Sequence, residues 1–223
     1  MNLKRQAAEA ALTAITPGMQ LGLGTGSTVA EFLTVLAAAD LGVSGVPTSE
    51  ATATRCRELG IPLLEPHEVD RLDLTVDGAD ELDHDLRATK GGGGALLREK
   101  VVASISERML VIATVDKLVE RLADTFALPV EVVPFAHTVV TRRLEQLGFH
   151  VKVRTGTSGE PLHTDNHNMV LDARFAGGIT DPAGVDVEIT MIPGVVTSGL
   201  FIDLVTEAYL AAPDGSVTHL IAT

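Results

Sequence analysis

Met19-Gln20-Leu21-Gly22-Leu23-Gly24-Thr25-Gly26-Ser27-Thr28 is a short apolar run that ends in a glycine-rich turn. Apolar residues at helical spacing follow it and predict a helix over 29–39. Strand, tight turn and helix in this order form the first unit of an α/β fold. Free N–H groups at the start of such a helix bind anions, and Thr25, Ser27 and Thr28 add hydroxyl donors. The turn is therefore a candidate phosphate or sugar site; the alternative is a tight corner without a ligand.

Strands and helices keep alternating along the first half of the chain. Further strands are expected at 41–46, 61–64, 72–76 and 109–113, and further helices over 3–15, 49–59 and 94–106. This alternation predicts a Rossmann-like, mostly parallel sheet with helices on both faces.

The pattern changes near Phe126-Ala127-Leu128-Pro129. From there it reads β-α-β-β-α, which resembles a split βαβ unit, with strands expected at 130–133, 149–154 and 168–174 and helices over 138–147 and 181–191. The last strands, at 199–205, 206–211 and 218–221, are expected to rejoin the first sheet. We therefore expect a Rossmann-like catalytic domain of residues 1–126 and 200–223, with a smaller inserted α+β (ferredoxin-like) lobe of residues 127–199.

Composition excludes several classes of protein. The net charge of −13 over 223 residues disfavours nucleic acid as a partner. No apolar run reaches the roughly 18 residues of a membrane span, and the N-terminal residues do not resemble a secretory signal, so a cytoplasmic location and no membrane contact are expected. The single cysteine, Cys56, excludes an internal disulfide. Either the neighbouring arginines lower the pKa of its thiol, or Cys56 is a small helix residue without a chemical role.

Two carboxylates stand together at the end of the strand expected at 72–76. Asp77 and Asp80 are separated by Gly78 and Ala79, and ligands of open α/β sheets bind outside the carboxyl ends of the strands. Close carboxylates disfavour double ionisation, which gives one acid and one base. An Asx turn with a helix cap, or a pair of Mg²⁺ ligands, are the alternatives.

Lys90 is followed by four consecutive glycines. A cation beside unshielded amides suits a phosphate or an enediolate oxygen, whereas the alternative is a floppy loop. Glu99 lies in the next helix between Arg98 and Lys100, a pattern that is typical of a solvated helix face. Its closeness in sequence to Lys90 makes it a candidate nonetheless.

Two nucleotide-binding motifs fail on the turn at 22–28. A dinucleotide fingerprint needs a third glycine where the chain has Ser27, and no Gly-Lys-Ser/Thr follows as a P-loop would require. No His/Cys cluster has zinc spacing.

Taken together, these segments resemble the ribose-5-phosphate isomerase family of the A type. The resemblance is carried by Gly24–Thr28, Thr48–Thr52, Asp77–Glu81, Lys90–Leu96 with Arg98-Glu99-Lys100, Leu128–Val132, Thr164–Asn166 and Pro193–Val196. It covers nearly the whole chain in order.

The resemblance implies interconversion of D-ribose 5-phosphate and D-ribulose 5-phosphate, the non-oxidative branch of the pentose phosphate pathway, without metal or other cofactor. It implies Glu99 as the general base, Asp77 and Asp80 as groups that assist ring opening and proton movement on the hydroxyls, and Lys90 as the cation at the enediolate oxygen. Implied substrate-binding residues are Thr25, Gly26, Ser27, Thr28, Asp77, Gly78, Ala79, Asp80, Lys90, Gly91, Gly92, Gly93 and Lys117. Lys4 is a further phosphate candidate with little motif around it.

Other protein classes share parts of this pattern. A sugar-phosphate deaminase or coenzyme A transferase would share the sheet and glycine loop, but the set Asp77, Asp80, Lys90 and Glu99 argues against both. The effector domain of a sugar-responsive repressor would carry a DNA-binding segment for which no room is seen before Gly22.

Asn166-His167-Asn168 replaces a commoner Asn-Gly-Asn, so His167 is either a site residue or a turn position. A homodimer or homotetramer is implied, with the inserted lobe as its interface.

Overall fold

The computed structural model describes residues 2–222 and divides the chain into two units. Unit 1 contains the described residues up to Ala79, Arg98–Leu118 and those from Asp203 onward; unit 2 contains Asp80–Leu97 and Val119–Ile202. The sequence-based division at 126/127 and 199/200 differs from this one mainly because residues 80–97 and 119–126 pack with the second unit.

Unit 1 is built on a six-stranded sheet of order β13-β12-β6-β3-β1-β2. Its strands are β1 (Gln20–Leu23), β2 (Ser44–Pro47), β3 (Leu74–Asp77), β6 (Met109–Thr114), β12 (Glu207–Ala211) and β13 (Val217–Ile221). Every neighbouring pair is parallel except β12 and β13. The mostly parallel sheet is thus confirmed, and β12 and β13 rejoin it as expected. The segment 61–64 forms only a single bridge, from Leu63 to Gly45.

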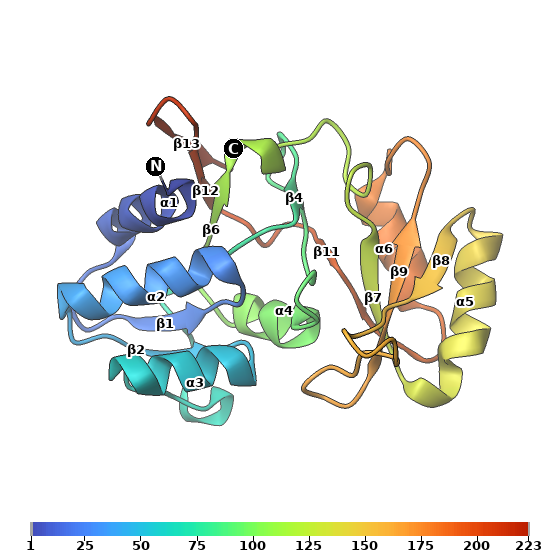
Figure 1. Ribbon diagram of the computed structural model, residues 1–223, viewed down its shortest axis with the longest axis horizontal. Helices are drawn as coiled ribbons and strands as arrows, with labels where there is room; N and C mark the ends of the chain where they lie inside the picture. Colours follow the sequence, from blue (N-terminus) through green and yellow to red (C-terminus); the bar gives the residue numbers. More distant parts are fainter. Residues whose placement is uncertain (1, 223) are drawn as a thin grey trace. The chain divides into compact units, whose positions relative to one another are not determined.

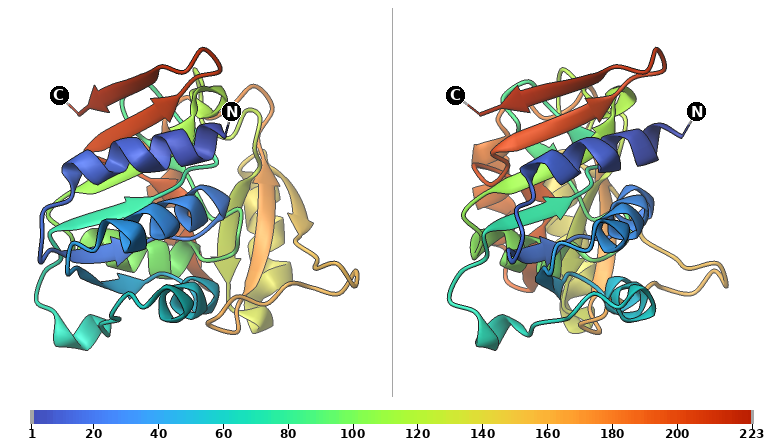
Figure 2. Two further views of the ribbon diagram at one scale, coloured as in Figure 1. Left: turned by 60° about the vertical axis from the view of Figure 1, so that its left-hand side comes forward. Right: turned by 90° about the vertical axis from the view of Figure 1, so that its left-hand side faces the viewer.

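Helices cover both faces of this sheet. They are α1 (Leu3–Ala11), α2 (Ser27–Ala39), α3 (Glu50–Leu59) and α4 (Leu96–Ser104), with short 3₁₀ turns at Leu12–Ala14, Pro66–Glu68 and Val115–Lys117. Leu21 and Leu23 of β1 pack with residues of α1 and α2 such as Ala7 and Phe32. Figures 1 and 2 show these two helices lying along the sheet. Because successive strand residues point to opposite faces, Gly22 faces the other side, where a Cβ would lie only 2.6 Å from Val102 of α4. Glycine at this position lets α4 approach the sheet.

Unit 2 contains a four-stranded antiparallel sheet of order β10-β7-β9-β8. Its elements are β7 (Leu128–Val132), a 3₁₀ turn (Pro134–Ala136), α5 (His137–Gln146), β8 (His150–Val153), β9 (Met169–Arg174), α6 (Pro182–Thr190) and β10 (Val195–Ser198). Val140 and Leu144 of α5 and Ile189 of α6 pack in one apolar cluster with strand β7. Figure 1 shows both helices beside the strands of this sheet. The connectivity and strand order are those of a ferredoxin-like unit, which confirms the predicted α+β lobe.

A small third sheet, also in unit 2, has the order β11-β5-β4. It consists of β4 (Glu81–Leu82), β5 (Ala88–Thr89) and β11 (Leu200–Phe201). The expectation that residues 199–205 return to the first sheet is wrong, because Gly199 bonds with Pro129 and Lys90 through its backbone and β11 then pairs with β5.

None of the helices described between residues 2 and 222 has the length and hydrophobicity needed to span a bilayer.

Candidate active site

The predicted site residues of unit 1 gather at the carboxyl ends of neighbouring parallel strands. Thr25 follows β1, Thr48 follows β2, Asp77 ends β3, and Lys117 closes the 3₁₀ turn after β6. These four strands are adjacent in the sheet order β6-β3-β1-β2. In open α/β sheets this edge is where ligands bind.

Asp77 is fully buried and holds the backbone of the glycine-rich turn. Its Oδ1 accepts hydrogen bonds from the N–H of Thr25 at 3.1 Å and of Gly78 at 2.7 Å. A Cβ on Gly24 would lie 2.2 Å from Asp77 Cγ, so only glycine permits this approach. Gly24 is therefore required by the carboxylate beside it.

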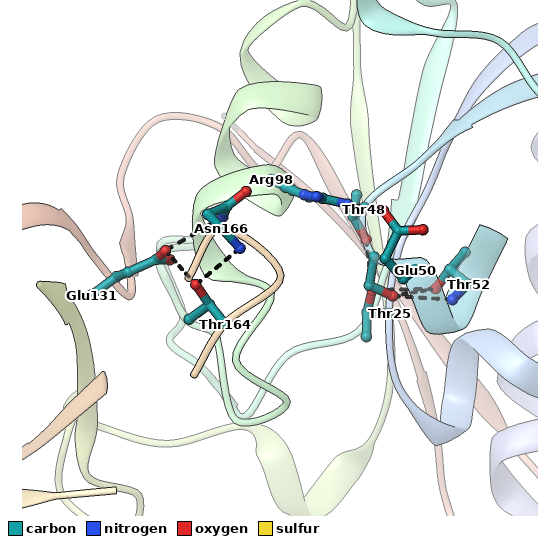
Figure 3. A network of polar contacts seen from close by, with 9 residues as sticks. Thr25, Thr48, Glu50, Thr52, Arg98, Glu131, Thr164 and Asn166 are labelled. Atoms are coloured by element: carbon teal, nitrogen blue, oxygen red, sulfur yellow. Dashed lines mark hydrogen bonds and ion pairs between the residues drawn. The ribbon is translucent and has the colours of Figure 1, made fainter. Parts of the chain in front are cut away.

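The Thr25 hydroxyl belongs to a network of hydroxyls from the segment after β2 (Figure 3). Its Oγ1 lies 2.7 Å from Thr48 Oγ1, 2.9 Å from Ser49 Oγ and 3.2 Å from Thr52 Oγ1. Thr52 in turn donates to the Gly24 carbonyl at 2.7 Å, while Ser49 caps α3 by accepting from the Thr52 N–H. The network fixes the turn after β1, and only the family resemblance at 48–52 pointed to it.

Gly26, Ser27 and Thr28 form the start of α2. Gly26 has φ +109°, a conformation that favours glycine, and Ser27 Oγ accepts a hydrogen bond from Lys4 Nζ at 2.8 Å. The first N–H groups of a 13-residue helix and a lysine ammonium thus lie at one exposed turn. A cavity of about 270 Å³ borders Gly26 and Ser27. Lys4, the candidate with the least sequence support, thus lies beside the turn of Thr25–Thr28.

Glu99 is only 4% exposed, so its reading as part of a solvated helix face is wrong. It lies one helical turn before Val102, whose side chain packs against the sheet through Val46 and Leu72. Arg98 donates to Glu50 Oε1 at 2.9 Å and so ties α4 to the first turn of α3. The hydrogen bond and charge of Arg98 hold the pKa of Glu50 below its ordinary value.

In unit 2 a short hairpin brings Asp80 and Lys90 together. Strand β4 pairs with β5 in the register Glu81–Thr89, and the Asp80 N–H also bonds to the Thr89 carbonyl at 2.9 Å. This register, extended by one residue, sets Asp80 opposite Lys90. The Lys90 side chain is 2% exposed, and its Nζ lies 5.4 Å from the centre of the Phe201 ring.

The glycines after Lys90 form a loop with a fixed path. The Gly92 N–H donates to Asp80 Oδ2 at 2.7 Å, and Arg154 donates to the carbonyls of Gly91 and Gly92. Gly91 has φ +99°, and a Cβ there would lie 2.7 Å from Leu96 Cβ. The floppy-loop alternative is therefore wrong, and Arg154 is a residue that sequence reasoning did not identify.

Glu81, which follows the candidate acid Asp80, has a structural role. Its buried carboxylate accepts from the N–H groups of Ala123, Thr125 and Phe126 and from the Thr125 hydroxyl, at 2.6–2.8 Å. It thereby anchors the segment that leads into β7.

Two of the segments that carried the family resemblance bond to each other in unit 2 (Figure 3). Glu131 of β7, fully buried, accepts from Thr164 Oγ1 at 2.9 Å and from the side-chain amides of Asn166 and Asn168 at 3.3 and 2.9 Å. His167 lies exposed at the turn between them with φ +62°. His167 stands where Asn-Gly-Asn would have glycine, and its positive φ agrees with a turn position.

Cys56 is buried in the core of unit 1. Burial raises the pKa of its thiol from 9.0 to about 11, against the opposing charge of Arg57. The reading as a small helix residue without chemistry therefore fits, and the activated thiolate does not. Among the described residues there is no group of three or more His, Cys, Asp or Glu side chains that could hold a metal ion.

The candidate residues thus fall into two sets. Unit 1 holds Glu99, Asp77, Gly78, Ala79, Thr25, Gly26, Ser27, Thr28 and Lys117; unit 2 holds Asp80, Lys90, Gly91, Gly92 and Gly93. A parallel sheet with an Asp, a helix start rich in hydroxyls and a lysine at its carboxyl edge is typical of α/β enzymes that act on small anionic substrates.

Comparisons with known proteins identify the family. The family model of ribose 5-phosphate isomerase A (phosphoriboisomerase A) matches residues 44–215. The ribose-5-phosphate isomerase A of Agrobacterium fabrum is 50% identical over 226 residues, which cover 96% of this chain and 95% of that protein. That of Sinorhizobium medicae is 50% identical over 224 residues, covering 97% and 96%. This chain belongs to the ribose 5-phosphate isomerase A family.

Solved structures agree with this assignment. Ribose 5-phosphate isomerase A of Methanocaldococcus jannaschii matches with a TM-score of 0.93 and 36% identity, covering 99% of this chain and 98% of that chain. A D-ribose-5-phosphate isomerase in complex with phospho-erythronic acid matches with a TM-score of 0.95 and 35% identity, covering 99% and 100%.

Proposed function

We infer that this chain is an aldose–ketose isomerase that interconverts D-ribose 5-phosphate and D-ribulose 5-phosphate through an enediolate, a step of the non-oxidative pentose phosphate pathway. The observation that carries this inference is family membership over nearly the full length, at 50% identity to named relatives. The alternative readings as a deaminase, a transferase or a repressor effector domain have no comparable support.

We propose that Glu99 is the general base. An aldose–ketose shift moves a proton between C2 and C1, which requires one base within reach of both carbons. A carboxylate that is 4% exposed has lost most of its hydration, and proton abstraction from carbon is favoured in such a site. The packing of Val102 and the Arg98–Glu50 ion pair fix the helix that carries Glu99.

Asp77 and Asp80 are proposed to open the sugar ring and to move protons on O1 and O2. They are three residues apart, so their Cα atoms are separated by at most about 11 Å. Asp77 Oδ1 accepts two backbone N–H bonds, from Thr25 and Gly78, whereas Asp80 accepts through Oδ2 from the Gly92 N–H. The two carboxylates thus have different surroundings, as an acid and a base require.

Lys90 is proposed to stabilise the enediolate oxygen. The β4–β5 register sets Lys90 opposite Asp80, and Lys90 is nearly buried; a charge acts more strongly in a site with little water. The N–H groups of Gly91–Gly93 are proposed as further donors to the substrate.

The phosphate is proposed to bind at the turn of Thr25–Thr28, where the helix dipole, hydroxyl groups and Lys4 coincide. Lys117, which closes the 3₁₀ turn after β6, is proposed as a further substrate-binding residue. The reaction exchanges protons only, so no redox cofactor is required, and the family resemblance implies no metal.

Phospho-erythronic acid, the ligand of the structural relative, provides a probe. Its carboxylate presents two oxygens at the end of a short phosphorylated chain, much as an enediolate does. We expect it to compete with ribose 5-phosphate on this protein.

The direct test is a coupled assay that measures ribulose 5-phosphate formed from ribose 5-phosphate by the purified chain. Unphosphorylated ribose and a hexose 6-phosphate, assayed in parallel, measure the contribution of the phosphate and of chain length. Turnover of ribose 5-phosphate no faster than of the hexose phosphate would contradict the assignment.

We further propose that the protein acts as a homodimer or homotetramer in the cytoplasm, with unit 2 in the interface. Phe135, which is 99% exposed, Met191 at 77% and Val187 at 61% are apolar side chains that association would cover. Light scattering tests this proposal. Phe135→Ser should lower the average mass, whereas Ile221→Ser, at an exposed apolar position of unit 1, should leave it unchanged.

A further inference from the structure

Arg154 sits between the glycine loop and strand β9 of unit 2, and it has no role in the chemistry described so far. It follows β8, and its side chain is 12% exposed. Its Nε lies 3.2 and 3.1 Å from the two carboxylate oxygens of Asp172, and its Nη2 also donates to Asp172. This leaves Nη1 to donate to the carbonyls of Gly91 at 2.7 Å and Gly92 at 3.0 Å.

These contacts fix the orientation of one peptide plane from both ends. The carbonyl of Gly91 accepts from Arg154, while the N–H of the same peptide, that of Gly92, donates to Asp80. Because C=O and N–H point in opposite directions across a trans peptide, Arg154 and Asp80 hold it from opposite sides. The Gly92 carbonyl also accepts from Arg154, so the N–H of that peptide, which belongs to Gly93, points away from Arg154.

A continuous series of hydrogen bonds therefore runs from Asp172 through Arg154 and the Gly91–Gly92 peptide to the carboxylate of Asp80. A guanidinium suits this arrangement because its planar fork satisfies a carboxylate and two carbonyls at once. Glycine has little conformational preference of its own, so the path of the loop must be imposed by its contacts.

We propose that Arg154, oriented by Asp172, is a positioning residue for the reaction: it sets the amides of Gly91–Gly93 and the carboxylate of Asp80 in the geometry that the substrate requires. This proposal rests on the proposed function, which assigns those groups to substrate binding and proton transfer. Arg154 acts through the loop and does not contact the reacting atoms.

A measurement without substrate tests the contact itself. In Arg154→Gln, amide hydrogen exchange of a peptide containing Gly91–Gly94 should accelerate at least about tenfold, because the Gly92 N–H loses its fixed orientation toward Asp80. The matched control is Arg174→Gln, which removes the same charge from strand β9 at a cavity that both Arg154 and Arg174 line. Exchange in Arg154→Gln within twofold of wild type, or an equal acceleration in Arg174→Gln, would overturn the proposal.

Kinetics test its consequence. Arg154→Gln should lower kcat/KM for ribose 5-phosphate about 10- to 100-fold, with KM raised as well as kcat lowered, because binding amides and Asp80 are disturbed together. A role in stability alone would reduce the amount of folded enzyme and leave KM unchanged. Arg154→Lys should recover part of the loss, since an ammonium keeps the charge but not the fork.

Asp172→Asn provides a second route if Arg154→Gln does not fold. It should shift exchange and KM in the same direction, and a double variant should be no worse than Arg154→Gln because both act through one guanidinium. Fully additive losses would overturn the proposal. If the wild-type chain showed no isomerase activity, the proposed function would fail, whereas the exchange experiment would still decide whether Arg154 orders the loop.

Discussion

Replacing Gly24 by alanine tests the packing of Asp77 against the turn after β1. The added Cβ would lie 2.2 Å from Asp77 Cγ and 2.7 Å from its Cα, whereas carbon atoms in contact are about 3.5–4.0 Å apart. Turn and strand must therefore separate by about 1.3 Å or more. The bond from the Thr25 N–H to Asp77 Oδ1, now 3.1 Å, would be lost, whereas the local bond from the Gly78 N–H to Asp77 Oδ1 would remain.

Overpacking of this kind costs about 1–3 kcal/mol of unfolding free energy, which for a chain of this length lowers Tm by roughly 2–12 °C. The catalytic loss should be about 100-fold in kcat/KM, because a shift near 1 Å at a group proposed to be catalytic is sufficient for it. Calorimetry and the coupled isomerase assay measure the two effects.

Gly156→Ala is the matched control, because a Cβ there meets its nearest neighbour only at 4.0 Å. It should leave both Tm and kcat/KM unchanged. If Gly24→Ala retained wild-type Tm and turnover, the argument that Gly24 is required by Asp77 would be refuted.

Three further predictions concern the cation, the metal and the thiol. Lys90→Ala should lower kcat and raise KM in steady-state assays, whereas an effect on KM alone would make Lys90 a simple phosphate anchor. EDTA should leave turnover unchanged, and loss with rescue by Mg²⁺ would be the contrary result. Folding favours the neutral thiol of Cys56, so the free energy of unfolding should decrease by about 2–3 kcal/mol as pH rises from 9.0 toward about 11. Urea titrations should show this slope in wild type but not in Cys56→Ala.

The sequence predicted those features that depend on local periodicity and on strand order. The βα unit at 19–39 and the position of Asp77 at a strand end follow from apolar spacing, and both are confirmed. Strand β11 was misplaced because two residues carry no periodicity, and its pairing is decided by the backbone of Gly199 meeting Lys90 and Pro129.

The burial of Glu99 and the long-range contacts of Arg154 could not be predicted from the sequence for a different reason. Arg98-Glu99-Lys100 has the composition of a solvated face, and only the packing of α4 on the sheet shows that Glu99 is buried. His150, Lys152 and Arg154 alternate as an exposed strand face does, so nothing local marks Arg154 as the partner of a glycine loop more than 60 residues away.

The Glu99→Gln variant tests the central claim most directly, since it removes the proposed proton carrier and changes the side chain by a single group. Its kcat for ribose 5-phosphate should fall by about 10²–10⁴-fold, while phospho-erythronic acid should bind with a Kd close to that of wild type. Turnover within about tenfold of wild type, with binding intact, would contradict the assignment of Glu99 as the base.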